Sequence, residues 1–254
     1  MEADEYRKLA EVEDRMWYFR SLHGHIRREL ERALASSAGA PARILDAGCG
    51  TGGLIRRLRA AHPDWSYEGV DVMPQACELA RAGCGPDIPI AEGSVTALPY
   101  PDATFDAVTS ADVIYQLDHP GEALAEFHRV LRPGGVAIVN VPAYRWLWSY
   151  HDVAVRSRHR FTRPEVDQLL TASGFAERRL THWNALPFPL IVVKRKLLAS
   201  AKDTSDVKLS PAPVEAMLNA AMAVEHAWLR AGGRWAWGSS ILAIARKPGV
   251  GGRV

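Results

Sequence analysis

Cysteine is scarce in this sequence, and long apolar runs are missing. The three cysteines among 254 residues, Cys49, Cys77 and Cys84, match neither a metal-ligand nor a disulfide spacing. Their odd number suggests reduced thiols in a cytoplasmic protein. No run of about 18 apolar residues could span a bilayer, and no charged-then-apolar signal segment opens the chain. The formal net charge of +2 argues against an obligate nucleic-acid partner, because such domains are usually strongly basic.

The composition that remains is typical of a soluble globular protein, with 48% hydrophobic and 24% charged residues. Short apolar runs alternate with amphipathic segments from residue 43 onward, which predicts parallel strands joined by right-handed helical crossovers. The run Val136–Val141 is almost entirely apolar and therefore indicates a central strand. Thr162 to Glu165 has the pattern of a capping box that opens a helix. The fold class that follows is α/β, with a doubly wound sheet.

A glycine-rich stretch organises this pattern. Ile44 and Leu45 end in the carboxylate Asp46, then Gly48, Gly50, Gly52 and Gly53 precede an amphipathic segment. This order predicts a strand, a tight turn and a helix whose N-terminus points at a ligand. A second strand ends at Asp71, at the distance where a doubly wound sheet places a carboxylate for ribose hydroxyls.

Two regions fall outside the alternating pattern. Residues 3–34 read as amphipathic helix, and residues 187–236 form an insertion that is far longer than an ordinary connection. We expect Val214, Met217, Leu218, Ala221 and Trp228 to share one face of a helix in this insertion. The predicted organisation is therefore an N-terminal helical cap (1–38), a nucleotide-binding core (39–186 and 237–248) and a helical lid (187–236).

The charge of the glycine-rich stretch bears on the ligand. Gly48, Gly50 and Gly53 satisfy the dinucleotide pattern G-x-G-x-x-G, so a nicotinamide oxidoreductase is an alternative. However, Asp46 would place a negative charge beside a diphosphate, whereas a cationic ligand would be favoured there. S-adenosylmethionine carries an ammonium, a sulfonium and a ribose. A P-loop is excluded because no Lys-Ser/Thr pair follows the glycines.

Five segments in order resemble the motifs of class I S-adenosylmethionine-dependent methyltransferases, and the strand-five exit resembles a bacterial type 11-like subgroup. The five segments are Asp46–Gly52, Gly69–Asp71, Gly93–Tyr100, Phe105–Val108 and Arg129–Gly135. The resemblance covers about residues 40 to 180. It implies a Rossmann-like, seven-stranded, mostly parallel sheet with an antiparallel last strand, and S-adenosyl-L-methionine as the cofactor.

The resemblance also implies which residues contact the cofactor. Gly48 and Gly50 would contact the methionine moiety, Asp71 the ribose hydroxyls, Ser94 and Val95 the adenine, and Ser110 or Ala111 would line the sulfonium side. Further predicted cofactor contacts are Asp46, Cys49 and Val72. Ser94 stands where an acid is most common, and a neutral hydroxyl accepts a weaker hydrogen bond. The aromatic cluster of residues 16–20 is best explained by core packing of a helix. In the alternative, Tyr18 or Arg20 closes over the cofactor carboxylate.

Methyl transfer needs an aligned acceptor and a group that removes its proton. Candidates follow strands four and five, and the predicted catalytic residues are His151, Tyr115 and Asp152; capping or docking roles are an alternative for each. The run Arg156–Arg160 could recognise an acidic group or be a solvated turn. No metal-ligand cluster is apparent.

The leading hypothesis is a methyltransferase acting on a small, natural-product or lipid-like acceptor by in-line transfer with base assistance. The acceptor would be hydrophobic or aromatic and carry an acidic group. A non-catalytic or peripherally membrane-associated module of the same fold is a further alternative, because Pro187–Leu198 is apolar with a basic end. Either a monomer or a homodimer is compatible with the sequence.

Overall fold

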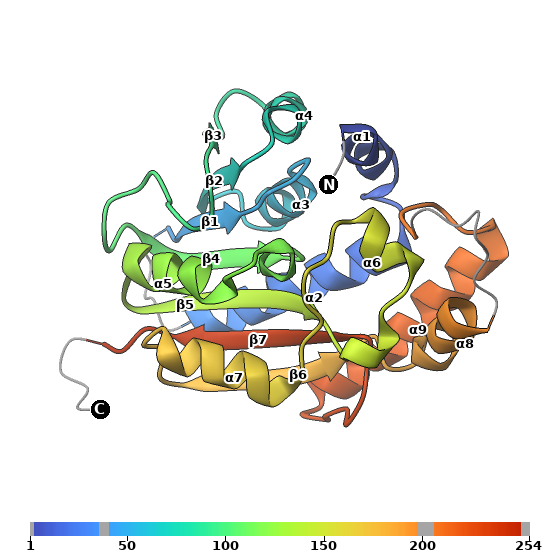
Figure 1. The fold of residues 1–254 in the computed structure, drawn as a ribbon. Helices are drawn as coiled ribbons and strands as arrows, with labels where there is room; N and C mark the ends of the chain where they lie inside the picture. Colours follow the sequence, from blue (N-terminus) through green and yellow to red (C-terminus); the bar gives the residue numbers. More distant parts are fainter. Residues whose placement is uncertain (1–2, 36–40, 198–205, 250–254) are drawn as a thin grey trace.

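A single seven-stranded sheet forms the centre of the protein (Figure 1). The computed structural model describes residues 3–35, 41–197 and 206–249. In spatial order the strands are β3-β2-β1-β4-β5-β7-β6, and β7 runs antiparallel to both of its neighbours. The strands are β1 (Arg43–Ala47), β2 (Ser66–Asp71), β3 (Ile90–Glu92), β4 (Phe105–Ala111), β5 (Leu131–Pro142), β6 (Arg178–Trp183) and β7 (Ser240–Arg246). The predicted seven-stranded, mostly parallel sheet with an antiparallel last strand is confirmed.

Helices fill the connections and cover both faces of the sheet. They are α1 (Ala3–Val12), α2 (Trp17–Leu34), α3 (Gly53–Ala61), α4 (Pro74–Cys84), α5 (Pro120–Val130), α6 (Tyr150–Ala154), α7 (Arg163–Ala172), α8 (Phe188–Lys196) and α9 (Ala212–Arg230). Two short 3-10 helices, η1 (Ile114–Gln116) and η2 (Arg145–Leu147), follow β4 and β5. Because the strand order runs outward from β1 in both directions, first through β2 and β3 and then through β4 and β5, the architecture is a doubly wound α/β sheet.

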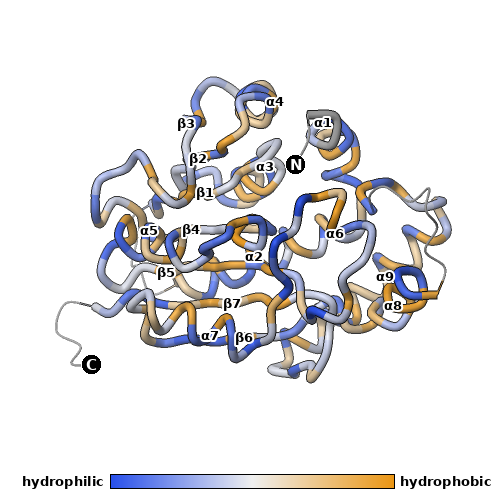
Figure 2. The backbone as a smooth tube through the Cα atoms, in the orientation of Figure 1, coloured by the Kyte–Doolittle hydropathy of each residue, from blue (hydrophilic) through white to orange (hydrophobic). Residues whose placement is uncertain are grey.

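Strand side chains alternate between two apolar cores, one on each face of the sheet. Ile44 packs in the core that includes α2, α3 and α4, whereas its neighbour Leu45 packs with α5 and α7 on the opposite face. The same alternation separates Ile138 from Val139 in β5. Because successive side chains of a strand point to opposite faces, strands that are apolar throughout are buried on both. Figure 2 shows this for β7, which is apolar along most of its length.

Local signals in the sequence fix several element ends. The backbone nitrogen and hydroxyl of Thr162 both lie within hydrogen-bond distance of Glu165, at 2.6 and 2.9 Å, which confirms the predicted capping box. The helical N-terminal region is two helices rather than one. Met16 is extended (φ −66°, ψ 129°) and separates α1 from α2.

The helix predicted in the insertion is present as α9, but of its predicted apolar face only Leu218 is buried. Leu218, Met222, Glu225 and Leu229 are buried, whereas Val214, Met217 and Trp228 are exposed by 38%, 53% and 50%. The buried face is the one that packs against α2, and it includes the polar residue Glu225.

Helices α1, α6, α8 and α9 gather around the end of the sheet where the parallel strands finish (Figure 1). Ligands bind at this end in open α/β sheets. No helix among the described residues combines the length and apolar character needed to cross a membrane.

Candidate functional site

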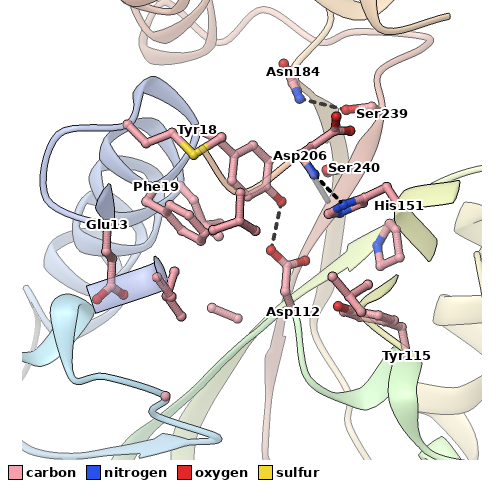
Figure 3. A pocket seen from close by; sticks show the side chains of 18 of the residues that line it. Glu13, Tyr18, Phe19, Asp112, Tyr115, His151, Asn184, Asp206, Ser239 and Ser240 are labelled. Atoms are coloured by element: carbon pink, nitrogen blue, oxygen red, sulfur yellow. Dashed lines mark hydrogen bonds between the residues drawn. The ribbon is translucent and has the colours of Figure 1, made fainter. Parts of the chain in front are cut away.

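A cavity of about 670 Å³ opens at the carboxyl ends of the parallel strands. Its volume is in the range of small-molecule and cofactor sites. The predicted site residues that line it are Tyr18, Asp46, Gly48, Cys49, Gly50, Asp71, Val72, Ser94, Val95, Tyr115, His151 and Asp152. Side chains from the N-terminal helices, the sheet edge, α6, α8 and α9 meet there, so segments distant in sequence share one space (Figure 3).

The turn after β1 lies at one end of this cavity. Gly48 and Gly50 have φ values of +83° and +53°, which side-chain-bearing residues adopt rarely. The backbone nitrogens of Gly48 and Cys49 both donate to the Val70 carbonyl of β2, at 2.7 and 3.0 Å. The turn is therefore held against β2, and its two cavity-lining glycines present bare backbone to a ligand.

Asp71 ends β2 beside this turn. Its two carboxylate oxygens accept hydrogen bonds from the backbone nitrogens of Gly50 (2.9 Å) and Met73 (3.0 Å). Burial raises the pKa of Asp71, and those two hydrogen bonds oppose the rise. The Tyr6 side chain also hydrogen-bonds to this carboxyl group. Asp71 is thus a fixed acceptor at the cavity wall, as binding of a ribose diol requires.

Asp46 ends β1 and is buried. Its Oδ1 accepts a hydrogen bond of 2.8 Å from the hydroxyl of Thr109, the residue opposite it in β4. Burial raises the pKa of Asp46 to about 7, and the nearby carboxyl groups of Glu13 and Asp71 add to the rise. A cation in the cavity would reverse this effect, because it would stabilise the ionised form.

A third carboxyl group at this end comes from the N-terminal region. Glu13 is buried and lies at the N-terminus of α3, where a Cβ on Gly53 would come within 2.1 Å of its carboxyl carbon. The Thr51 hydroxyl donates to Glu13 over 2.5 Å. Rossmann dehydrogenases place the dinucleotide diphosphate at this helix terminus. The position is taken here by a carboxyl group, which disfavours the nicotinamide alternative.

A network of polar side chains surrounds Asp112, which follows β4 and lines the same cavity (Figure 3). Tyr18 donates to one Asp112 oxygen and the Asn140 amide to the other, both over 2.8 Å. Trp183 donates to the Asn140 oxygen over 2.7 Å, so only one orientation of the amide satisfies both contacts. Asp112 has φ +56°, an uncommon backbone conformation that the network holds in place.

The charge state of Asp112 is set mainly by burial, which raises its pKa to about 6. Hydrogen bonds from Tyr18 and Asn140 favour the ionised form and limit the rise. At neutral pH, Asp112 is therefore a carboxylate that can accept a proton from a neighbouring molecule. Its pKa lies closer to neutrality than that of an ordinary aspartate, which is the property a general base needs.

His151 lines the same cavity from α6. Its Nδ1 accepts a hydrogen bond of 3.1 Å from the backbone nitrogen of Asp206 (Figure 3). Burial and then the positive charge of Arg195 lower the pKa of His151 to about 4. The imidazole is consequently neutral at physiological pH with one nitrogen engaged, and Nε2 is the atom left for contact with a ligand.

Asp152, the predicted neighbour of His151, makes other contacts. One of its oxygens accepts from the Ser149 backbone nitrogen (2.9 Å), and the other forms a buried ion pair with Arg160 (2.9 Å). These contacts cap α6 and hold the chain that follows it. The buried hydroxyl of Tyr115 accepts a hydrogen bond from Gln116 over 3.2 Å, and burial raises its pKa. Whether either residue acts in catalysis stays a prediction.

Two predicted cofactor residues, Arg20 and Ser110, lie outside the cavity lining, whereas Ala111, the alternative to Ser110, is part of it. Arg20 is exposed and is not among the residues that line the cavity, because it follows Tyr18 and Phe19 onto the solvent side of α2. Ser110 is fully buried and also outside the lining, where Ala111 and Asp112 take its place. Ser94 lines the cavity, but its hydroxyl is 2.8 Å from that of Thr96.

Sequence reasoning missed Glu13, Asp112 and Asn140. Asn140 did carry a signal, because a single amide in an otherwise apolar central strand needs a buried polar partner. Asp112 directly follows strand four, at the edge where ligands bind, and could have been found in the same way. Glu13 gave no signal, since one acid in an amphipathic helix is ordinary. Within the described residues, no cluster of His, Cys, Asp or Glu side chains could hold a metal ion.

Comparison with known proteins agrees with this geometry. Residues 45–139 match the methyltransferase domain family. The matched part of the chain therefore resembles a methyltransferase domain. It extends from β1 to β5 and contains Asp46, Asp71 and Asp112. The predicted resemblance is confirmed for this part of the chain, and with it S-adenosylmethionine as the cofactor of the domain.

Relatives and solved structures extend the likeness. A demethylmenaquinone methyltransferase of Deinococcus radiodurans is 42% identical over 113 residues, which is 42% of this chain and 47% of that protein. The chain spans about half the length of the curated relatives it matches. A methyltransferase solved with a Haloferax volcanii activator has a TM-score of 0.57 at 21% identity, covering 97% of this chain and 94% of that one.

The cyclase SpnF has nearly the same likeness, with a TM-score of 0.56 at 20% identity over 88% of this chain and 81% of that one. Similarities at these identities show the fold alone, and one fold can carry different reactions. The activity of the protein therefore has to be argued from its methyltransferase domain and its cavity.

Proposed function

We propose that the protein transfers a methyl group from S-adenosylmethionine to a small apolar acceptor that carries an acidic hydroxyl or carbon. One observation carries the proposal: a single cavity is lined both by Asp46 and Asp71, which we call its donor end, and by Asp112 and Tyr18, which we call its acceptor end. The first pair suits a cationic nucleoside, and the second pair suits an acceptor that loses a proton. Both ends belong to or adjoin the methyltransferase domain.

The cofactor fits the first end by the chemistry of its groups. Asp71 would accept hydrogen bonds from the ribose hydroxyls, and Asp46 would face the ammonium of the methionine moiety across the glycine turn. When bound, the cofactor supplies an electrophilic methyl group on a sulfonium. Asp46 and Glu13 would stabilise the positive charge, while a diphosphate would be repelled by both.

Asp112 is proposed to remove the proton of the acceptor. Asp112 would take the proton of the acceptor, and the electron pair left on the acceptor would bond to the methyl carbon as the bond from that carbon to sulfur breaks. The bound cofactor would supply the methyl group and leave as the neutral thioether S-adenosylhomocysteine. In-line attack requires the nucleophile opposite the leaving sulfur, so the protein's main task is alignment. Tyr18 and Asn140 hold the carboxylate in place. Asp112 is preferred over His151 because the pKa of His151 is lower.

The cavity wall supports an apolar acceptor of modest size. Side chains from several elements form an apolar surface between the two polar ends: Phe19, Leu22, Leu117, Val155, Ile191 and Leu218. The Deinococcus relative is named for a quinone precursor, and an aromatic hydroquinone would suit both this wall and a carboxylate base. A hydroquinone is therefore the acceptor class proposed here.

Replacing Asp112 by Asn tests the proposal. The D112N variant keeps an acceptor for the Tyr18 hydroxyl but cannot take a proton, so methyl transfer to a naphthohydroquinone should fall about 10²–10⁴-fold. The measurement is transfer from methyl-labelled S-adenosylmethionine. The wild-type rate should also fall as pH decreases through about 6, since the carboxylate then becomes protonated.

The matched control is D118N, which removes a carboxylate whose side chain is 71% exposed. It should leave the rate unchanged. A D112N rate equal to that of wild type would disprove the base role. Cofactor binding without transfer to any acceptor of this class would instead favour another reaction on the same fold, as in SpnF.

A further inference from the structure

A stripe of exposed apolar side chains runs along α8 beside the mouth of the cavity. Leu190, Val193 and Leu197 recur at the spacing of one helix face and are exposed by 56%, 40% and 75%. No residue of α8 is buried. A surface helix normally turns its apolar stripe toward the core. Here the stripe is exposed, and no core packing is assigned to it among the residues that the structure describes.

Two tryptophans extend the stripe from a separate segment. Trp146 and Trp148, in and after η2, are exposed by 54% and 36%. The Trp146 ring meets that of Phe188 in α8 edge to face, with centroids 6.0 Å apart. Lys196 donates to the Trp148 carbonyl over 2.9 Å. These contacts join η2 and α8 into one surface, the apolar rim, made of Leu190, Val193, Leu197, Trp146 and Trp148.

The charges around the rim have one dominant sign. The sequence contains no acidic residue from 178 to 202 or from 142 to 151, the two segments that build the rim. Asp206 lies nearby but forms ion pairs with Lys194 and Arg195. Arg145 and Lys196 form no ion pair with any carboxylate of the described residues. Exposed cations therefore flank the apolar side chains, and Figure 2 shows apolar and hydrophilic positions side by side in α8.

We propose that the apolar rim docks on the surface of an anionic lipid bilayer. Leucine, valine and tryptophan beside lysine and arginine, without acids, is the composition of elements that lie in the membrane interface. The aliphatic and indole side chains would enter the boundary between headgroups and acyl chains, while Arg145 and Lys196 contact lipid phosphates. A protein partner is less favoured because the rim offers no carboxylate for a complementary contact.

Docking in this way has a geometric consequence for the cavity. Leu190 belongs to the rim and also lines the cavity. Pro187 and Ile191, which lie next to it in the same segment, line the cavity as well. The docked protein would therefore hold the mouth of its cavity at the membrane surface. An apolar molecule dissolved in the lipid could then enter without crossing water. The docking itself requires no particular acceptor and no methyl transfer.

Vesicle co-sedimentation of the full chain, without methyl donor, tests the proposal. We expect binding to phosphatidylglycerol–phosphatidylcholine vesicles and much weaker binding to phosphatidylcholine alone. The double variant V193E/L197E changes two rim residues outside the cavity lining and should lose at least tenfold in affinity. The variants R145Q and K196Q should each bind these vesicles about fivefold more weakly, which is the contribution expected of one cation at an anionic surface. This difference in affinity should shrink at high salt, because salt screens the attraction.

The matched control is V224E, which places the same charge at a 63% exposed valine of α9 outside the rim. It should bind vesicles like wild type, and all variants should melt at the wild-type temperature. Absence of binding by wild type, or equal losses in V224E and V193E/L197E, would overturn the proposal. So would size-exclusion chromatography showing that wild type pairs through the rim and that V193E/L197E merely separates the copies. Because cofactor binding is measured separately by calorimetry, failure of docking is distinct from failure of the proposed activity.

Discussion

At the scale of single residues, the cofactor end of the cavity is a cluster of carboxyl groups that are hard to ionise. Asp46, Glu13 and Asp71 all have raised pKa values, with burial as the largest cause. His23 is close to Glu13, but burial lowers its pKa to about 3, so it stays neutral and supplies no compensating charge. Ionising these buried carboxyl groups is therefore costly, and a positively charged ligand would relieve that cost.

Because Asp46 is costly to ionise, the stability of the fold should depend on pH. Its pKa is raised to about 7 in the folded protein, so folding takes up a proton between the ordinary aspartate value and pH 7. The stability that Asp46 contributes is present at low pH and lost as pH rises through about 7. D46N removes the charge yet can still accept from Thr109. At pH 8 it should therefore raise the melting temperature by roughly 2–4 °C, the shift typical of 1 kcal/mol.

Binding should respond in the opposite sense. Because the ammonium favours ionised Asp46, wild-type affinity for S-adenosylhomocysteine should increase from pH 6 to pH 8, and this increase should be smaller in D46N. Calorimetric titration at several pH values measures both. If the affinity of D46N for S-adenosylhomocysteine depended on pH as that of wild type does, the group that titrates would be another carboxyl group, such as Glu13.

At the scale of elements, α9 is fixed to the core through one buried carboxylate. Glu225 accepts hydrogen bonds from the backbone nitrogens of Asn184, Ala185 and Leu186, over 2.5, 2.8 and 3.1 Å. These three groups leave the end of β6 and would otherwise be buried without partners. The helix predicted to be a lid therefore also has a structural role, because it satisfies the chain that leads into α8.

We predict that E225A lowers the free energy of unfolding by roughly 2–5 kcal/mol, since several buried donors lose their acceptor. E225Q retains one acceptor oxygen and should lose less. V224A, at the adjacent exposed position, should stay within about 0.5 kcal/mol of wild type. Urea unfolding measures all three. Equal stability of E225A and V224A would contradict the role assigned to these hydrogen bonds.

Elements also show what the sequence could and could not reveal. β1, β2 and the turn between β1 and α3 were predictable, because apolar runs, glycines and terminal acids are local signals. The Tyr18–Asp112 contact was not, because it joins residues 94 positions apart in the sequence. The same holds for the buried face of α9, where packing against α2 overrode the pattern of apolar residues.

At the scale of the whole molecule, ligand selectivity should follow from charge rather than from the glycine pattern. S-adenosylhomocysteine at 100 times its dissociation constant should stabilise the fold by about 2.7 kcal/mol, which raises the melting temperature by roughly 5–10 °C. NADH should cause no comparable shift, because Glu13 occupies the helix terminus that a diphosphate needs. Thermal unfolding with each ligand measures the difference. Greater stabilisation by NADH would revive the oxidoreductase alternative.

The N-terminal helices have a consequence for how such a protein can diversify. The methyltransferase domain match begins at residue 45, yet Glu13 reaches the donor end of the cavity and Tyr18 reaches the acceptor end. The residues matched to the methyltransferase family and the two N-terminal residues that reach the cavity thus lie in separate stretches of the sequence. Exchange of the first 35 residues between relatives could retune what is recognised while the donor machinery of β1 and β2 is inherited intact.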